Sequence, residues 1–445
     1  NTPGIVIPGG VMNAGPDLLT LEQIGKYSAQ FERGEITKEQ FMYYKHNACP
    51  SCGACSFLGT ATTMQIMAEA LGVALPGSSL LPATSEELKQ VCIDAAPYIK
   101  NLMDKDLKPK DIMTKKAFEN AIMVHAAIAG STNSLLHIPA IAHECGIELD
   151  GDDFDRIHRE VPYLLNIRPS GFWPAQYYLY AGGTPGIMKA IKKHLHLDVM
   201  TVTGKTLGEN LDELENNGYF EKCYKYLDDL KLKPTDIIRD YDNPIQKEGA
   251  VAVLKGNLAP EGAVVKHSAV PKPMQETVLS ARVFNCEEDA IDAILHGRIN
   301  KGEAVFIRYE GPKGAGMPEM FYTTEAISSD PELSASIALL TDGRFSGASK
   351  GPAIGHISPE AANGGPIAMV EDGDLIEISV SRRALNVIGI HGEKMDIEEV
   401  NKVLEERKKN WVKPKPHFTS GALALYSRFA VSPMKGGYID LGEEE

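Results

Sequence analysis

The 445-residue sequence lacks an uninterrupted apolar run of the roughly 20 residues that a membrane-spanning helix requires. It also lacks a charged segment followed by an apolar one at its start, the pattern of a secretory signal. Positive charge is scarce, because 45 Lys and Arg stand against 60 Asp and Glu, and the net charge is −15. This balance argues against nucleic acids and anionic membranes as partners, since their phosphates would be repelled. We therefore expect a globular, cytoplasmic protein.

Several familiar site patterns are missing as well. The seven cysteines are an odd number, and three of them crowd into positions 49–55, so they do not form a disulfide framework. No His-Glu-x-x-His pattern occurs. Gly204-Lys205-Thr206 resembles the end of a Walker A loop, but Val199 stands where that loop requires its first glycine. Metalloprotease and Walker-type nucleotide sites are therefore not predicted.

The length of the chain, and the change along it from mainly helical to mainly strand-forming sequence patterns, predict two domains. Residues 61–72, 85–100 and 115–129 have helical periodicity and alternate with short apolar segments. A polar, turn-rich segment at 230–248 is interpreted as a linker. Strands are predicted beyond it at 250–254, 263–266, 304–309, 336–341, 374–380 and 385–390.

These patterns predict an α/β fold. We expect an N-terminal α/β/α sheet domain at residues 1–242, followed by a β-rich, barrel-like C-terminal domain at residues 243–445. The chain opens abruptly with Asn1-Thr-Pro-Gly-Ile-Val-Ile-Pro-Gly-Gly, which we interpret as a buried strand that runs into a glycine turn. We therefore expect that a further segment precedes it and that the N-terminal domain is incomplete here.

Cys49, Cys52 and Cys55 follow the spacing C-x2-C-x2-C just before a predicted helix. Thiolates at this spacing can converge on iron, and a helix N-terminus stabilises an anionic cluster. The alternative is a group of small apolar core residues. A ferredoxin-like carrier would need a fourth ligand near a proline, and a structural zinc site would need another close Cys or His pair.

Two glycine-rich loops each follow a predicted strand. The first, residues 308–320, carries Glu319 at its far end, where a carboxylate is a suitable ligand for a hard cation. The second, residues 340–349, places Ser346 on a tight turn, where a serine acts as a nucleophile, as a metal-assisted base, or only as a turn residue. Taken alone, the first loop is equally compatible with an ordinary solvated glutamate, and the second is better explained as a simple turn.

Taken together and in order, the motifs of this chain resemble those of the dihydroxy-acid/phosphogluconate dehydratase (IlvD/Edd) family. The resemblance covers nearly the whole chain. It rests on the N-terminal PGG turn and on ACPSCGAC, GTATTM, AEALG, AGSTNSLLHIPAIA, LKGNLAPEGAVVK, FIRYEGPKGAGMPEM, TDGRFSGAS and GHISPEAANGGPIA.

This resemblance implies a hydro-lyase that removes water from a 2,3-dihydroxy acid and gives a 2-keto acid through its enol. It implies an iron–sulfur cluster, [2Fe–2S] or [4Fe–4S], with Cys55 as a ligand, and Mg²⁺ with Glu319 as a ligand. Ser346 corresponds to the catalytic base of the family. Candidates for the lining of the substrate pocket are Ser131, Thr132, Asn133 and Lys266. The habit of the family implies a homodimer or homotetramer.

Within the family, the residues of HLDVMTVTGKTLGENL and of the segment after Glu319 are similar to the corresponding sequences of the sugar-acid dehydratases. Xylonate-type aldonates are therefore the first expected substrates. ACPSCGAC favours dihydroxy-acid dehydratase of branched-chain amino-acid biosynthesis, so 2,3-dihydroxyisovalerate is the second.

The sequence departs from the family in one respect. Members carry two further cluster cysteines and a Cys-Asp-Lys motif, which binds magnesium, and no Cys-Asp-Lys occurs in this sequence. The expected explanation is a fragment or a shortened member. Two other functions follow as alternatives: a non-catalytic homologue that binds a partner or an acid, and a redox or sensor protein built on Cys49, Cys52 and Cys55.

Overall fold

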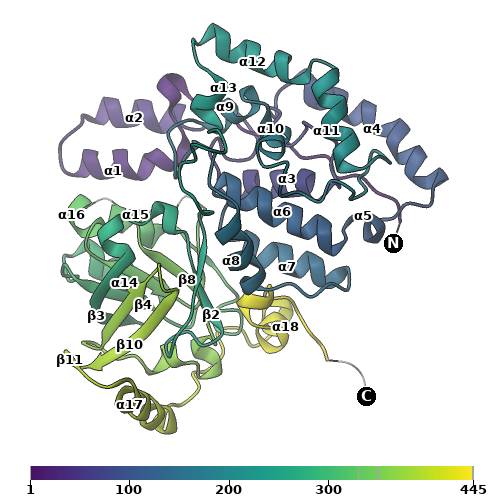
Figure 1. The fold of residues 1–445 in the computed structure, drawn as a ribbon. Helices are drawn as coiled ribbons and strands as arrows, with labels where there is room; N and C mark the ends of the chain where they lie inside the picture. The colour runs from purple at the N-terminus through teal and green to yellow at the C-terminus, as the bar shows by residue number, and fades with distance from the viewer. Residues whose placement is uncertain (1, 329, 348, 350, 443–445) are drawn as a thin grey trace. The chain divides into compact units, whose positions relative to one another are not determined.

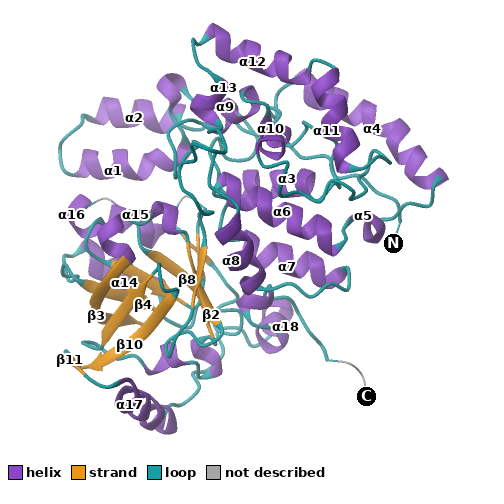
Figure 2. Cartoon of the chain, viewed as in Figure 1, coloured by secondary structure: helices purple, strands orange, loops and turns teal. Residues whose placement is uncertain are grey.

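A computed structural model describes residues 2–328, 330–347, 349 and 351–442. The chain divides into two compact units (Figure 1). The first unit comprises residues 1–134, 141–148 and 156–250, and the second comprises residues 135–140, 149–155 and 251–445. Figure 2 shows helices and loops throughout the first unit and places the sheet in the second. None of the helices in the described ranges combines the length and the apolar character that a bilayer crossing demands.

Helices build the first unit, and α6 (Lys115–Ile128) lies at its centre. Nearly every side chain of α6 beyond its first turn is buried, which is the pattern of a helix surrounded by protein. It packs against α3 (Thr60–Ala70) and α10 (Gly183–Ala190). The other helices are α1 (Ile24–Glu32), α2 (Lys38–Asn47), α4 (Glu86–Asp104), α5 (Pro109–Ile112), α7 (Ser134–Glu144), α8 (Gly151–Glu160), α9 (Ala175–Tyr180), α11 (Leu207–Asn216), α12 (Tyr219–Asp229) and α13 (Pro234–Ile237), of which α7 and α8 are shared between the units.

The sheet predicted for the N-terminal half is not found among the described residues of this unit. Its extended segments meet only in isolated bridges, such as Val6 with Ala74 and Val11 with Ala54. Pro8 interrupts the first segment, because proline cannot donate to a ladder. Val6 is 47% exposed, so the interpretation of this segment as a buried strand was wrong.

The segment at 230–248, predicted to be a linker, packs within the first unit instead. Ile237 and Ile238 are buried, and the chain bridges from Ile238 to Leu165 and from Gln246 to Tyr163. The polar composition of the segment concealed this apolar pair, whose burial favours packing over a free connection.

A nine-stranded sheet forms the second unit. Its spatial order is β1-β2-β8-β6-β4-β3-β9-β10-β11. The strands are β1 (Ala252–Leu254), β2 (Gly262–Val265), β3 (Glu276–Phe284), β4 (Glu303–Ile307), β6 (Ala338–Thr341), β8 (Ala353–Ser358), β9 (Leu375–Ser379), β10 (Ala384–Ile390) and β11 (Glu393–Lys394). A bridge from Lys255 to Ala384 joins the end of β1 to β10, so the sheet curls back on itself in the barrel-like manner predicted.

The interior of the curled sheet is apolar. Ile376 and Ile378 of β9 stand opposite Val387 and Leu385 of β10, and all four are buried. This alternation is the period-2 pattern seen in the sequence. The helices of the unit are α14 (Glu287–Leu295), α15 (Tyr322–Ser328), α16 (Pro331–Ser334), α17 (Ile397–Asn410) and α18 (Gly421–Phe429).

The two glycine-rich loops emerge at one edge of this sheet. Strands β4 and β6 are parallel neighbours, with Ile307 paired to Thr341 at their carboxyl ends. Loops that follow neighbouring parallel strands leave the sheet at the same edge. The loops that begin at Arg308 and Asp342 therefore lie side by side, as the parallel pairing of β5 (Glu319–Met320) with β7 (Arg344–Phe345) shows directly.

Candidate active site

In the first unit, Cys55 lies beside the N-terminal turn of α3. The hydroxyl of Thr62 donates to the Cys55 carbonyl at 2.7 Å and lies 3.7 Å from its Sγ. A Cβ added at Gly59, the N-cap of α3, would lie 2.5 Å from that sulfur. Glycine thus lets the thiol approach the N-terminal end of a helix that has no acidic residue in its first turn.

The other two cysteines of the motif lie in a different environment. Cys49 and Cys52 are exposed. The Ala54 N–H donates to the Gly10 carbonyl, and the Met12 N–H donates to the Ala54 carbonyl, so backbone pairing with the N-terminal segment begins only at the residue before Cys55. The three thiols therefore do not converge, and no group of three or more metal-ligating side chains forms within the described part of the chain. The spacing alone did not reveal this, because the turn at Gly53 separates the thiols.

Ser131 and Asn133 meet the same turn of α3 from its other neighbour, α6. Helix α6 ends at Ala129 in the left-handed conformation, and the following loop doubles back. Thr60 Oγ1 lies 3.1 Å from Ser131 Oγ and accepts from Asn133 Nδ2 at 2.7 Å. Ser131 and Asn133 are buried, whereas Thr132 is partly exposed. The structure thus gathers Cys55, Ser131 and Asn133 around one helix end.

A buried pair of histidines contacts the backbone of the loop that carries Ser131. His125 Nε2 lies 2.9 Å from the Ser131 carbonyl, and its Nδ1 lies 3.1 Å from His158 Nε2. A Cβ at Gly130 would lie 2.3 Å from the His125 ring, so the loop can close over the imidazole only with glycine there. Sequence reasoning missed this pair, since 33 residues separate its members.

In the second unit, Glu319 and Ser346 lie near one another. Glu319 in β5 pairs with Arg344 in β7, and Ser346 follows two residues after Arg344. Glu319 is exposed and Ser346 is half-buried. The side chain of Arg344 donates from Nε to the Met317 carbonyl at 2.8 Å, which fixes the loop just before Glu319. Both predicted residues are thus carried by one small parallel sheet.

Asp342 holds the two loops together. Its fully buried carboxylate accepts from the backbone N–H groups of Tyr309 at 3.2 Å, Glu310 at 3.0 Å and Ala361 at 2.8 Å. Glu360 plays a similar part, since it accepts from the N–H groups of Lys313 and Gly314. Both acids lie inside the sequence motifs, but their role as acceptors for distant backbone groups could not be read from spacing.

These carboxyl groups have unusual acidities. Burial raises the pKa of Glu310 to about 7 and that of Glu360 to about 7, and the neighbouring charge of Asp342 adds to both shifts. Burial likewise raises the pKa of Asp342 to about 6, although its three N–H donors act in the opposite direction. The pKa values of all three carboxyl groups are therefore raised towards neutral pH, chiefly by their burial.

Lys266 directly follows β2. Its backbone carbonyl accepts from the Ala269 N–H, and the Ala269 carbonyl accepts from the Gly351 N–H. These bonds place Lys266 near the serine loop, the loop after β6 that carries Ser346 and Ser349. The ammonium group of Lys266 is buried and finds no hydrogen-bond partner among the described residues. Burial lowers the pKa of Lys266 to about 7.

His356 is a further buried group that the sequence did not single out. It adopts φ +55° in the middle of β8, where its N–H donates to the Gly343 carbonyl at 2.8 Å. Neither ring nitrogen has a hydrogen-bond partner within the described ranges. Burial, with Arg344 adding to it, lowers the pKa of His356 to about 3, so its imidazole is neutral. No motif of paired histidines marked this residue.

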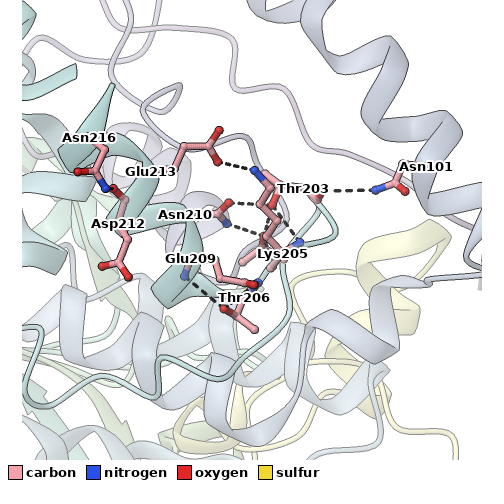
Figure 3. A network of polar contacts seen from close by, with 10 residues as sticks. Asn101, Thr203, Lys205, Thr206, Glu209, Asn210, Asp212, Glu213 and Asn216 are labelled. Carbon is pink, nitrogen blue, oxygen red and sulfur yellow. Dashed lines mark hydrogen bonds and ion pairs between the residues drawn. The ribbon is translucent and has the colours of Figure 1, made fainter. Parts of the chain in front are cut away.

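The Walker-like segment is a structural turn (Figure 3). Lys205 Nζ pairs with Glu213 at 2.6 Å, and Thr206 caps α11 by accepting from the Glu209 N–H. The Glu209 carboxylate in turn accepts from the Thr206 backbone N–H, which completes a capping box. The lysine and the threonine thus stabilise a helix start, in agreement with the rejection of a nucleotide loop.

The chain belongs to the dihydroxy-acid/6-phosphogluconate dehydratase family. The N-terminal model of this family matches residues 1–210 and its C-terminal model matches residues 236–437. The resemblance stated from the motifs is therefore confirmed, and so is the enzyme class, a hydro-lyase.

Named relatives are similar along almost the whole chain. A protein of Acetivibrio thermocellus called dihydroxy-acid dehydratase is 43% identical over 99% of this chain and 76% of its own length. One of Methanosarcina acetivorans called dihydroxy-acid dehydratase 1 is 44% identical over 98% of this chain and 76% of its own length. A Caldanaerobacter subterraneus protein that is also called dihydroxy-acid dehydratase is 43% identical over 98% of this chain and 74% of its own length.

The residues present do not by themselves make a complete site for an iron–sulfur cluster or for magnesium. Cys55 and Glu319 are candidate ligands, and neither belongs to a metal-ligating group of three or more acidic, cysteine or histidine side chains within the described ranges. The assignments of Cys55, Glu319 and Ser346 remain predictions that rest on the family motifs.

Proposed function

We propose that this chain dehydrates a 2,3-dihydroxy acid of the branched-chain type to the corresponding 2-keto acid. The observation that carries the proposal is the identity of more than 40% with relatives named dihydroxy-acid dehydratase, along nearly the entire chain. The names of these relatives favour 2,3-dihydroxyisovalerate as substrate over the aldonates, which the motif sequences predict as the first choice. The aldonate preference rested on short segments, whereas the identity extends over both units.

The proposed reaction is an elimination. The C2 proton is removed, the C2–H electron pair forms the double bond, and the 3-hydroxyl leaves with a proton as water. The resulting enol then becomes the 2-keto acid. We assign Ser346 as the group that takes the C2 proton, because it lies half-buried beside the strand pair that carries Glu319. An unassisted serine is too weak a base, so this role requires an anion-stabilising neighbour.

The ends of the substrate need different partners. We propose that Lys266 binds the carboxylate, because a buried amine with no protein partner gains most from an anionic ligand. Ser131, Thr132 and Asn133 remain candidates for neutral substrate contacts at the end of α3. No step is assigned to an iron–sulfur cluster or to magnesium, since the ligand sets around Cys55 and Glu319 are incomplete.

A substrate panel tests this proposal. Anaerobically purified protein, reconstituted with iron and sulfide and supplied with magnesium, should form 2-keto acid from 2,3-dihydroxyisovalerate at least about tenfold faster than from C5 or C6 aldonates, because kcat/KM reports differential transition-state binding. Faster turnover of an aldonate would overturn the substrate assignment.

The incomplete ligand sets favour one second candidate, a non-catalytic homologue that binds an acid. Iron content separates the two. Protein that retains no iron after reconstitution and that turns over no member of the panel, yet still binds 2,3-dihydroxyisovalerate in calorimetry, would support the second candidate against the first.

A further inference from the structure

A cleft of about 660 Å³ lies within the second unit, bounded by the loop after α17 and by α18. Its volume is typical of small-molecule sites. Its charged lining residues are all basic, and no aspartate or glutamate lines it. These basic residues are Lys313, Lys413, Lys415, His417 and Arg428. The enrichment is unexpected on a chain of net charge −15.

Elsewhere on this surface, lysines are regularly paired with acids. Lys205 pairs with Glu213 at 2.6 Å, and Lys409, four residues before Lys413, pairs with Glu406 at 2.5 Å. Within the described ranges, no comparable ion pair is formed by the four lysine and arginine side chains of the cleft. Their positive charge is therefore not neutralised by neighbouring acids at contact distance, and the walls of a cleft concentrate such a field.

Two of these cations are less available than the others. A smaller adjoining cavity of about 350 Å³ shares Lys313 and Arg428 and is also lined by Glu261, Glu360 and Asp440. The nearby Glu360 offsets part of the charge of Lys313. Lys413 and Lys415 line only the larger cleft, and none of the acids of the smaller cavity lines that cleft.

The local backbone also suits an anion. Lys413 and Lys415 alternate with Pro414 and Pro416, whose restricted φ angles limit the loop and reduce the entropy lost on binding. The N-terminal end of α18 lines the same cleft, its Ser420 N-cap makes no side-chain capping bond, and its first turn carries no acid. These features add to the field of the basic side chains.

The remaining walls are apolar or aromatic. Phe418, Phe429 and Leu425 line the cleft, and Tyr309 joins them from the glycine-rich loop that also carries Glu319. Trp411 Nε1 donates to the hydroxyl of Tyr309 at 3.2 Å, which links the basic loop to this motif. Ser427 adds a buried hydroxyl that has no hydrogen-bond partner among the described residues.

We infer that this cleft binds a small organic phosphate, with Lys413 and Lys415 holding the phosphate groups and the aromatic wall holding the rest of the molecule. Lysine and arginine side chains with donors free to reorient are suited to phosphate oxygens. Ser346, Glu319 and Cys55 do not line this cleft, and its binding of a phosphate does not depend on the proposed reaction.

Calorimetric titration of the full chain with inorganic pyrophosphate tests this inference. We expect one bound pyrophosphate per chain and a Kd that rises by about tenfold or more in the double variant Lys413→Gln/Lys415→Gln, because two charge-assisted contacts are lost. Lys409→Gln is the matched control, and it should leave the Kd unchanged because Lys409 does not line the cleft. All three lysines are exposed, so the variants should fold normally.

Five results would overturn the inference. Three concern pyrophosphate: no binding, a Kd that the double variant leaves unchanged, and equal weakening by Lys409→Gln. The fourth is tighter binding of citrate, which would assign the cleft to polycarboxylates, and the fifth is tighter binding of a hexaglutamate peptide, which would assign it to an acidic protein segment. Titration requires neither bound iron nor turnover, so a failed dehydratase assay leaves its result interpretable.

Discussion

The candidate residues fall into a first half, within the first unit, and a second half, within the second unit, and the two groups are held by different forces. In the first unit, short neutral side chains meet around the end of α3, with Ser131, Thr60 and Asn133 within hydrogen-bonding distance of one another. In the second unit, the carboxylates of Asp342 and Glu360 hold backbone N–H groups of a loop in a buried setting. Buried charge costs more to leave unpaired than a neutral group does. The second half should therefore be harder to alter without loss and more sensitive to pH.

The largest effect is expected for Asp342→Ala. The change leaves three N–H groups without their acceptor, so we expect the free energy of unfolding to fall by roughly 3–5 kcal/mol in urea denaturation. Asp330→Ala is the control, because Asp330 also accepts backbone N–H groups but is exposed at the start of α16. It should cost only about 1 kcal/mol. Equal losses would show that burial is not the source of the difference.

Lys266→Met should have the next largest effect, with the opposite sign. Burial lowers the pKa of Lys266 from 10.5 to about 7, so between these pH values the unfolded chain holds more protons than the folded chain. The stability of the wild type therefore rises with pH through this window. Near pH 7 the methionine variant should be more stable by roughly 1–3 kcal/mol, and this advantage should shrink towards pH 10. A difference that is independent of pH would contradict the burial of a titrating amine.

Asn133→Ala tests the neutral half. The variant loses the 2.7 Å bond to Thr60 in a buried site, and we expect a loss of roughly 1–2 kcal/mol that does not change between pH 5 and 8. Asn410→Ala, which removes an exposed amide, should stay within about 0.5 kcal/mol of the wild type. A strong pH dependence of the Asn133 variant would remove the contrast between the two halves.

The smallest effect on stability is expected for Gly59→Ala. The added Cβ would lie 2.5 Å from Cys55 Sγ, and rotation of the thiol can relieve the clash at a cost of about 1 kcal/mol. The rate of alkylation at Cys55, followed by peptide mass spectrometry, should nevertheless change severalfold. Gly9→Ala, where an added Cβ meets nothing within 4 Å, is the control and should leave that rate unchanged. An unaltered rate in Gly59→Ala would place the thiol elsewhere.

The sequence predicted the strands of the second unit better than the architecture of the first. The expected strands at 304–309 and 374–380 correspond to β4 and β9, because their apolar runs are long and flanked by turns. Strand β8 was missed, since Gly355 and His356 interrupt its pattern. In the first unit, the short apolar segments form bridges instead of a sheet.

The candidate site also contains residues that the sequence could point to and residues that it could not. Motifs selected candidate residues in loops, such as Ser131 and Ser346, because glycine-rich turns are visible in a sequence, and the roles of these residues stay predictions. The supporting groups, such as His125 and Asp342, were not identified. Their roles depend on partners 33 residues away or on backbone N–H groups, and neither leaves a pattern in spacing.

The central claim is that the serine loop of the second unit carries the base of a dehydratase, and Ser346→Ala tests it most directly. Keto-acid formation from 2,3-dihydroxyisovalerate should be compared in reconstituted wild type, Ser346→Ala and Ser349→Ala, the last of which alters a neighbouring hydroxyl of the same loop. The account predicts that Ser346→Ala lowers kcat by about 100-fold or more with unchanged iron content, whereas Ser349→Ala retains most of the activity. Near-normal turnover in Ser346→Ala, or an equal loss in both variants, would contradict it.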